Sequence, residues 1–289
     1  MSYSYIDIRP NPVTGIGSYQ RGLSLQDFVD LPQVEHRHIG GDWKATFRIY
    51  ANDRNLAEDL LFLGVGREVK IYNDKGIVDF GGMIYVVTLS TGGSKVSASL
   101  LNMSNRVWAR WQEAGTANPP DRSAVFDNTA SQGLYGIKEE VWSAGQQVSV
   151  AEASQYAEKQ LTKSPWPTPR VVEISPGKKL SDRPILDITC YGWWHTLSHV
   201  RYNQIALAGA ANASVVVDAV VADADIGQLI RSVNIQANGT PIEQTIDADM
   251  GADTIIKSIV DMGDAYLNTW VAGVDHTREF YYRKRGLEA

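Results

Sequence analysis

The chain has 289 residues, more than one domain usually contains, and this length predicts two compact domains. Hydrophobic residues make up 44% of the chain and charged residues 21%, which excludes a largely disordered or fibrous protein. A formal net charge of -6 gives no electrostatic attraction to phosphate and argues against nucleic acid as the principal ligand.

The first clear pattern lies at residues 34–50, where apolar and polar side chains alternate. Trp43, Ala45 and Phe47 share one face, which predicts a half-buried strand. Residues 52–63 place leucines at helical spacing after the capping candidates Asn52 and Asp53, so we expect a short helix that ends at Gly64.

Four short strands are predicted next, with turn residues between them, at residues 68–72, 77–80, 83–89 and 95–100. The glycine pair at 81–82 is expected to form one of the turns. Closely spaced short strands of this kind are typical of a small barrel or sandwich.

Residues 115–122 form a polar stretch with Pro119 and Pro120, which predicts an exposed excursion near the end of a first domain. An amphipathic helix is expected at 150–163. It cannot continue into the proline-rich residues 164–169, which we interpret as a stiff, extended connector.

In the second half, residues 185–191 and 194–202 are predicted strands, and residues 213–222 and 252–262 are predicted helices. Residues 269–274 and 278–283 flank a three-residue loop and predict a closing hairpin.

Two properties bear on location. Polar and acidic residues occupy positions 1–10, where a signal peptide would have a basic start and an apolar core, so we expect synthesis in the cytosol. The longest near-continuous apolar stretch, 215–222, contains Asp218 and is far shorter than the about 18 residues that a membrane span needs.

Two pairs of histidines are close enough in sequence to be candidate metal ligands. His195 and His199 are four residues apart on a predicted strand, without the glutamate and helix of a zinc protease. His36 and His38 share a strand face but have no third ligand nearby in the sequence. We interpret all four as structural or surface histidines and expect no metal site.

Other motifs also favour structural roles. Residues 64–66 lack the third glycine of a dinucleotide fingerprint, and residues 92–95 have no helix after them to bind phosphate. The acidic run 247–253 departs from a calcium loop because Ser258 stands where the bidentate glutamate belongs. Asp249 or Asp253 is instead expected to cap or complement the following helix.

The sequence offers no motif that indicates a catalytic nucleophile. The Gly-x-Ser-x-Gly elbow is absent, and Cys190, the single cysteine, lies in an apolar run and is expected to be buried, which also excludes an intrachain disulfide. Paired carboxylates for sugar cleavage carry no weight without a cleft. We therefore predict a non-enzymatic protein with no catalytic residue, cofactor or metal.

Aromatic residues are numerous, with eight tryptophans and thirteen tyrosines. They suit both cores and oligomer interfaces. Five tryptophans lie between residues 142 and 270, and one of the neighbours Trp193 and Trp194 is expected to be exposed because successive strand residues face opposite ways.

Taken in order, several segments resemble the hub proteins of phage tails. The segments are LGVG at 63–66, REVKIY at 67–72, FGGMI at 80–84, LNMSNRV at 101–107, ASQGLYGIKE at 130–139, DITCYGWWHTL at 187–197, GD at 263–264 and WVAGV at 270–274. The resemblance covers most of the chain and is to tail-associated and baseplate hub proteins.

The resemblance implies an α+β, mainly β fold with two small β-barrel-like tube domains and inserted helices. Residues 1–112 would form the first barrel, 113–164 a bridging segment with a helix, and 165–289 a second β-rich domain with helices near 213–222 and 252–262. Three subunits would then build a pseudo-sixfold ring that continues the tail tube.

The implied function is structural. The ring would adapt sixfold to threefold symmetry in the virion tail tip and contact a distal tail or tube protein ring, the tape-measure protein and tail-tip fibre or spike proteins. DNA would only pass through the channel, and the acidic composition fits this transit. Because the sequence ends at Ala289 without a fibre-like or hydrolase extension, receptor binding and wall degradation are not expected.

Two alternatives remain open at this point. A hexameric distal tail ring protein would use the first barrel as its ring, and stoichiometry distinguishes it from a hub. A carbohydrate-binding or glycosidase module would need a cleft in which exposed tryptophans flank two close carboxylates.

Overall fold

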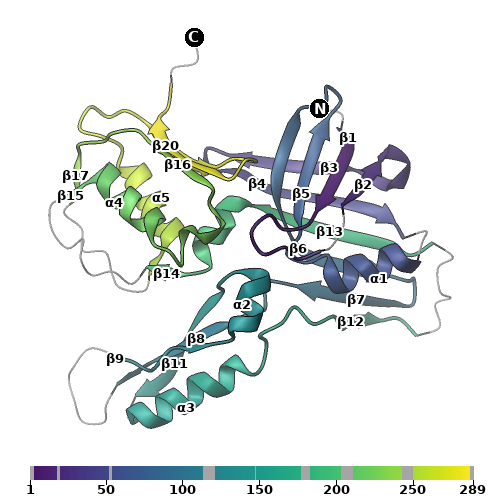
Figure 1. Ribbon diagram of the computed structural model, residues 1–289, viewed down its shortest axis with the longest axis horizontal. Helices are drawn as coiled ribbons and strands as arrows, with labels where there is room; N and C mark the ends of the chain where they lie inside the picture. Colours follow the sequence, from purple (N-terminus) through teal and green to yellow (C-terminus); the bar gives the residue numbers. More distant parts are fainter. Residues whose placement is uncertain are drawn as a thin grey trace.

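The computed structural model describes residues 3–17, 20–51, 54–112, 121–146, 148–176, 183–202, 211–242 and 250–286. The protein is mainly β with several helices (Figure 1). A large mixed sheet forms the main body, two helices pack beside one end of it, and a small α/β unit lies below it in the view of Figure 1.

The large sheet combines strands from both halves of the chain. Its strands are β1 (Tyr3–Arg9), β2 (Arg21–Ser24), β3 (Phe28–Arg37), β4 (Ile39–Tyr50), β5 (Glu68–Asn73), β6 (Val78–Ser90), β7 (Ser94–Ser99), β12 (Arg170–Ile174), β13 (Ile185–Gly192), β16 (Ser232–Ile235), β19 (Trp270–Val274) and β20 (Glu279–Lys284). They follow the order β16-β20-β19-β4-β13-β6-β5-β1-β2, with β3 paired to β4, and β12 joined to β6 through β7.

The expectation of two barrel-like tube domains is not met. The strand path begins at β16 and ends at β2, and these two strands do not pair, so the described strands close no barrel. The physical reason is that β13, from the second half of the chain, lies between β4 and β6 of the first half. One continuous sheet results.

Strand β13 shows why the sequence folds this way. Its side chains alternate between half-buried and buried positions, with Leu186, Ile188 and Cys190 inside the core. Ile188 lies opposite Phe47 on β4 and Val87 on β6. The predicted strand and the burial of Cys190 are both confirmed.

Two expected strands at 77–80 and 83–89 are one strand, β6, and the glycines between them form no turn. A Cβ on Gly82 would lie 2.3 Å from the carbonyl oxygen of Tyr191, and one on Gly81 would lie 2.5 Å from Cβ of His276. These glycines permit a close approach of neighbouring chain segments, a role that sequence alone does not separate from a turn.

The strand predicted at 34–50 is instead the end of β3 and the whole of β4, which form an antiparallel hairpin that turns at His38. The turn residue is neither glycine nor proline. Gly40 and Gly41, which follow, adopt φ angles of +112° and +72°. The predicted alternation within β4 itself is confirmed by the buried Ala45, Phe47 and Ile49.

A small unit contains β8 (Arg106–Gln112), β9 (Asp121–Arg122), β10 (Phe126–Asp127), β11 (Glu139–Gln146), α2 (Thr129–Tyr135) and α3 (Val150–Leu161). Its core is separate from the main one and contains Val107, Ala109, Ala153 and Ala157. Helix α3 was predicted and begins with a capping box between Ser149 and Glu152. The unit thus includes β8, which the sequence placed with the first domain.

The remaining elements cover the main sheet or connect its strands. They are α1 (Arg54–Leu63), α4 (Ala213–Ala222), α5 (Ala252–Met262), the 3-10 helices η1 (Leu25–Asp27), η2 (Trp193–Ser198) and η4 (Gly227–Leu229), and the short strands β14 (Arg201–Tyr202), β15 (Ala211–Asn212), β17 (Pro241–Ile242) and β18 (Met250–Gly251). The predicted helices at 52–63, 213–222 and 252–262 and the hairpin of β19 and β20 are confirmed.

The strand expected at 194–202 is wrong, because residues 193–198 form the 3-10 helix η2. Trp193 and Trp194 are consequently both buried, and neither is the exposed member that a strand would give. Several sequence assignments, namely the caps Asn52 and Asp53, the pair Pro119 and Pro120, and Asp247 and Asp249, fall outside the described residues.

None of the helices in the described part of the chain is both long and apolar enough to cross a bilayer.

Candidate functional site

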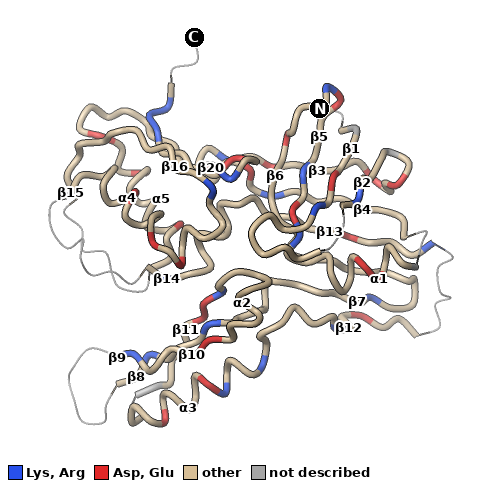
Figure 2. The backbone as a smooth tube through the Cα atoms, viewed as in Figure 1, with Lys and Arg blue, Asp and Glu red and all other residues tan. Residues whose placement is uncertain are grey.

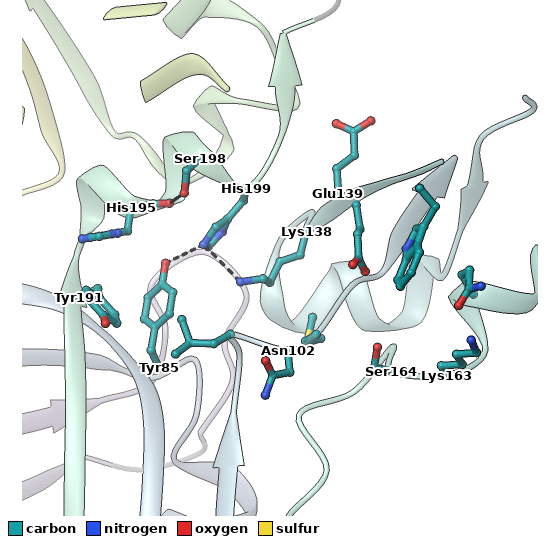
Figure 3. A pocket seen from close by; sticks show the side chains of 15 residues that line it. Tyr85, Asn102, Lys138, Glu139, Lys163, Ser164, Tyr191, His195, Ser198 and His199 are labelled. Carbon is teal, nitrogen blue, oxygen red and sulfur yellow. Dashed lines mark hydrogen bonds between the residues drawn. The ribbon is translucent and has the colours of Figure 1, made fainter. Parts of the chain in front are cut away.

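A cavity of about 720 Å³ lies between the main sheet and the small unit (Figure 3). The main body contributes Tyr85 from β6, Tyr191 from β13 and His195 from η2. The small unit contributes residues of β11 and α3, and the connection after β7 contributes residues 101–103. The cavity therefore exists only because the two units lie against each other.

At one wall, three polar side chains from distant parts of the sequence meet. The hydroxyl of Tyr85 lies 2.8 Å from Nε2 of His199, and Nζ of Lys138 lies 3.4 Å from the same nitrogen (Figure 3). A neutral imidazole has only one acceptor nitrogen, so we assign Nε2 of His199 as the acceptor and the tyrosine as its closer donor.

Burial sets the charge of these groups. It lowers the pKa of Lys138 to about 8, and it lowers the pKa of His199 well below its ordinary value, with the lysine charge adding to the effect. The pKa of Tyr85 is raised by burial and by Tyr191. At neutral pH the histidine and tyrosine are neutral, and Lys138 carries the charge of the cluster.

His195 lies in an aromatic cage beside this cluster. Its ring centroid is 4.3 Å from that of Trp43 and 4.4 Å from that of Tyr191. Burial, Arg37 and Lys138 lower its pKa to about 4, and its Nε2 is buried without a hydrogen-bond partner. His195 is therefore a neutral packing residue with one unused polar atom.

The structure brings His195 and His199 together on one side of the cavity but gives them no third ligand. Within the described ranges, no group of three or more His, Cys, Asp or Glu side chains is placed to hold a metal ion. The cluster also lacks a carboxylate that orients an imidazole, so it does not form the nucleophile, base and acid arrangement of a hydrolase.

His36 lies at the surface, as expected, but it also has two acidic neighbours. Its Nδ1 lies 3.1 Å from Asp42, and its Nε2 lies 3.8 Å from Asp79. The hydrogen bond with Asp42 raises the pKa of His36 above its ordinary value. The acidic partners come from β4 and β6, so spacing within β3 could not reveal them. His38 lines a separate, smaller cavity near Trp270.

The other sequence candidates have structural roles. Burial raises the pKa of Cys190, so it is no nucleophile. Residues 64–66 form a turn, and residues 92–93 join β6 to β7. Asp253 lies in the first turn of α5, where it complements the helix dipole, whereas the N-cap Gly251 has no side-chain hydrogen bond.

Sequence reasoning missed Tyr85 and Lys138. They are more than fifty residues apart, and each lies in a segment that reads as an ordinary strand or its flank. Lys138 precedes two glutamates, a pattern that indicates a solvated surface rather than a buried amine.

Strand β12 is a second notable feature, because it lies at a sheet edge and every one of its residues is exposed. Val171 and Val172 are each 59% exposed and Ile174 is 70% exposed. Among the described strands, β12 pairs only with β7, so the backbone groups of its outer side have no strand partner.

The loop after α5 also presents apolar side chains to solvent. Tyr266 is 86% exposed and Leu267 is 95% exposed, and Leu267 adopts a φ angle of +59°. The carboxylate of Asp264 holds the loop by accepting hydrogen bonds from the backbone of Tyr266, from Asn268 and from Trp270. The loop is therefore fixed while its apolar side chains remain uncovered.

Comparisons with known proteins found similarity to a solved structure. No protein-family model matches the chain, and no curated protein matches its sequence. The chain is similar to the tail protein from Neisseria meningitidis MC58, with a TM-score of 0.43 and 10% sequence identity. The alignment covers 99% of this chain and 52% of that chain, so this chain spans about half the length of that protein.

Proposed function

We propose that this chain is a non-enzymatic structural subunit of a phage tail tip, a hub that forms a trimer and continues the tail tube as a pseudo-sixfold ring. The proposal rests on the sequence resemblance described above and on one structural observation, the exposed apolar edge strand β12. The ring would adapt sixfold to threefold symmetry and let DNA and the tape-measure protein pass.

Strand β12 supports assembly because an unpaired, apolar edge is an aggregation hazard in a protein that stays alone. Val171, Val172 and Ile174 point their apolar surface to solvent on both faces of the strand. Pairing with a strand of a neighbouring subunit would satisfy the free backbone groups and cover these side chains.

The loop with Tyr266 and Leu267 fits the same role. Because Asp264 already holds the loop that carries these large side chains, the loop backbone loses little conformational freedom on binding, which favours their use as interface anchors. Leu267 remains in a backbone conformation that costs energy for a residue other than glycine. A subunit interface would explain both the exposure and the cost.

The expected partners are further copies of this chain, a distal tail or tube protein ring, the tape-measure protein and tail-tip fibre or spike proteins. Its place would be the tail tip of the virion, after synthesis in the bacterial cytoplasm. Positive and negative side chains are interspersed along the described chain (Figure 2), which fits a conduit that DNA traverses without adhering.

A glycosidase or sugar-binding module is less well supported. All eight tryptophans lie in the described residues, and Trp166, at 38% exposure, is the exposed one. A sugar cleft flanked by several exposed tryptophans is therefore not formed.

The deciding experiment is the rotational symmetry of the chain in its native assembly, measured by image averaging of particles or by the mass of the recovered complex. Threefold symmetry with a central channel supports the hub. Sixfold symmetry supports a distal tail ring protein instead, and a stable monomer that is absent from every particle overturns both.

A further inference from the structure

The cavity between the main sheet and the small unit contains a buried cation that no acid neutralises. The side chain of Lys138 is 8% exposed. Its Nζ forms no ion pair with any carboxylate in the described part of the chain. Burying a charged group without a counter-ion is costly, so an uncompensated lysine facing a cavity indicates a missing anion.

The contacts of Lys138 with the rest of the protein do not satisfy all N–H donors of its ammonium group. Nζ lies 3.4 Å from Nε2 of His199, but the hydroxyl of Tyr85 already occupies that nitrogen at 2.8 Å. The other contact of Nζ is the ring face of Tyr85, 5.4 Å from its centroid. An ammonium has three donors, so donors remain for a ligand.

Glu139, the adjacent carboxylate, is committed elsewhere. One of its oxygens accepts a hydrogen bond from the indole nitrogen of Trp108, and the other accepts one from the backbone nitrogen of Arg201 at 2.7 Å. These bonds tie β11 to β8 within the small unit and to the segment after η2. Glu139 is therefore not the counter-ion of its neighbour.

A second buried polar group lines the same cavity. Gln160 on α3 is 5% exposed, and its amide oxygen has no hydrogen-bond partner. A buried acceptor without a donor costs free energy comparable to a lost hydrogen bond. The cavity thus combines a donor-rich cation with an unused acceptor, and a ligand that carries both a carboxylate and an N–H or O–H group would satisfy both.

The charges of the lining favour a single negative charge. Lys138 and Lys163 line the cavity together with Glu139 and Glu140, and both neighbouring histidines are neutral. Because the two glutamates of the lining offset its two lysines, a dianion such as phosphate would meet as much negative as positive charge, whereas a carboxylate needs only one cation. The volume of about 720 Å³ lies within the range of small-ligand sites.

We propose that this cavity is a binding site for a monocarboxylate that also carries a hydrogen-bond donor, with Lys138 as the anion partner and Gln160 as the acceptor. A free small acid and the C-terminus of a peptide share this chemistry. Bound ligand would contact β6 and η2 of the main body and β11 and α3 of the small unit at once, and so would fix one against the other. The proposal does not depend on a role in a phage tail.

The test follows the indole resonance of Trp142, which lines the cavity, during titration of the folded chain by NMR. The probes are N-acetylglycine, acetate and inorganic phosphate. We expect saturable shifts with N-acetylglycine, weaker binding of acetate, and no saturable shift with phosphate. No saturation with either carboxylate at high millimolar concentration, or tighter binding of phosphate, overturns the proposal.

Variants assign the two contacts. Lys138→Met keeps the length of the side chain and removes its charge, and we expect at least about tenfold weaker binding of both carboxylates. Gln160→Met should weaken N-acetylglycine and leave acetate unchanged. Lys159→Met, on an exposed face of α3, is the matched control and should change neither. Equal binding by Lys138→Met, once an unchanged spectrum elsewhere shows that it is folded, refutes the assignment.

Titration with a peptide that has a free C-terminus, and with the same peptide as a C-terminal amide, distinguishes a peptide terminus from a free small acid as the ligand. Binding of the free-acid peptide alone identifies a chain terminus as a ligand. Binding of N-acetylglycine but of neither peptide assigns the site to free small acids.

Discussion

The position of β13 between β4 and β6 makes the two halves of the chain unfold together, and Ile188→Ala tests this. Ile188 is 1% exposed and lies opposite Phe47 and Val87. The substitution removes three buried carbons at about 0.8 kcal/mol each and leaves a cavity in a packed sheet, so we expect a loss of about 3 to 4 kcal/mol in the free energy of unfolding.

The assay is urea denaturation combined with hydrogen exchange measured on peptides from each strand. Ile188→Ala should lower the protection of β4 and β6, in the first half, as much as that of β13. Val171→Ala on the exposed strand β12 is the control and should change the stability by less than about 0.5 kcal/mol. Reduced protection in β13 with unchanged protection in β4 and β6 would refute the reasoning.

Three further predictions concern other parts of the structure. The bond between His36 and Asp42 should contribute less than about 1 kcal/mol because the histidine is half exposed. Since that bond raises the pKa of His36, its contribution is full below about pH 6.5 and is lost as pH rises through the folded pKa. Asp42→Asn should reduce this pH dependence of the urea midpoint and leave the smaller part that comes from Asp79. Gly82→Ala should destabilise the chain by more than about 2 kcal/mol in urea titrations, because its Cβ would clash with backbone. Gly133→Ala, in open space on helix α2, should instead stabilise it by about 0.5 to 1 kcal/mol. The opposite order of stabilities would contradict the close-approach argument. Leu267→Gly should leave the melting temperature unchanged or higher, because it removes an unfavourable φ angle. The same variant should be incorporated less into native particles. Normal incorporation would show that this loop is not an interface.

Local patterns in the sequence predicted the helices and several strands. Alternation revealed β4 and β13, and helical spacing with a stop signal revealed α1, α3 and α5, because in each case the side chains report the burial of one face. The segment 194–202 was misassigned because a 3-10 helix with two buried tryptophans has no periodicity that distinguishes it from a strand.

The candidate site could not be predicted from the sequence, for a different reason. Tyr85 comes from β6, Lys138 directly precedes β11 and His199 directly follows η2, and only the tertiary fold brings them within hydrogen-bond distance. Nothing adjacent to Lys138 in sequence signals that it is buried. The order of strands in the sheet, and with it the absence of a closed barrel, likewise depends on long-range pairing that local periodicity does not encode.

The order of strands in the central sheet also determines which parts of the chain can fold first during synthesis. β4 is complete at Tyr50 and β6 at Ser90, but the strand that joins them begins only at Ile185. A nascent chain must therefore wait with two unpaired strand edges until residue 192 has left the ribosome, and such non-local pairing is slow. The small unit, whose strands and two helices lie within residues 106–161 and have their own core, can form during this wait. Completion of the sheet is then a late step, which follows the formation of the small unit.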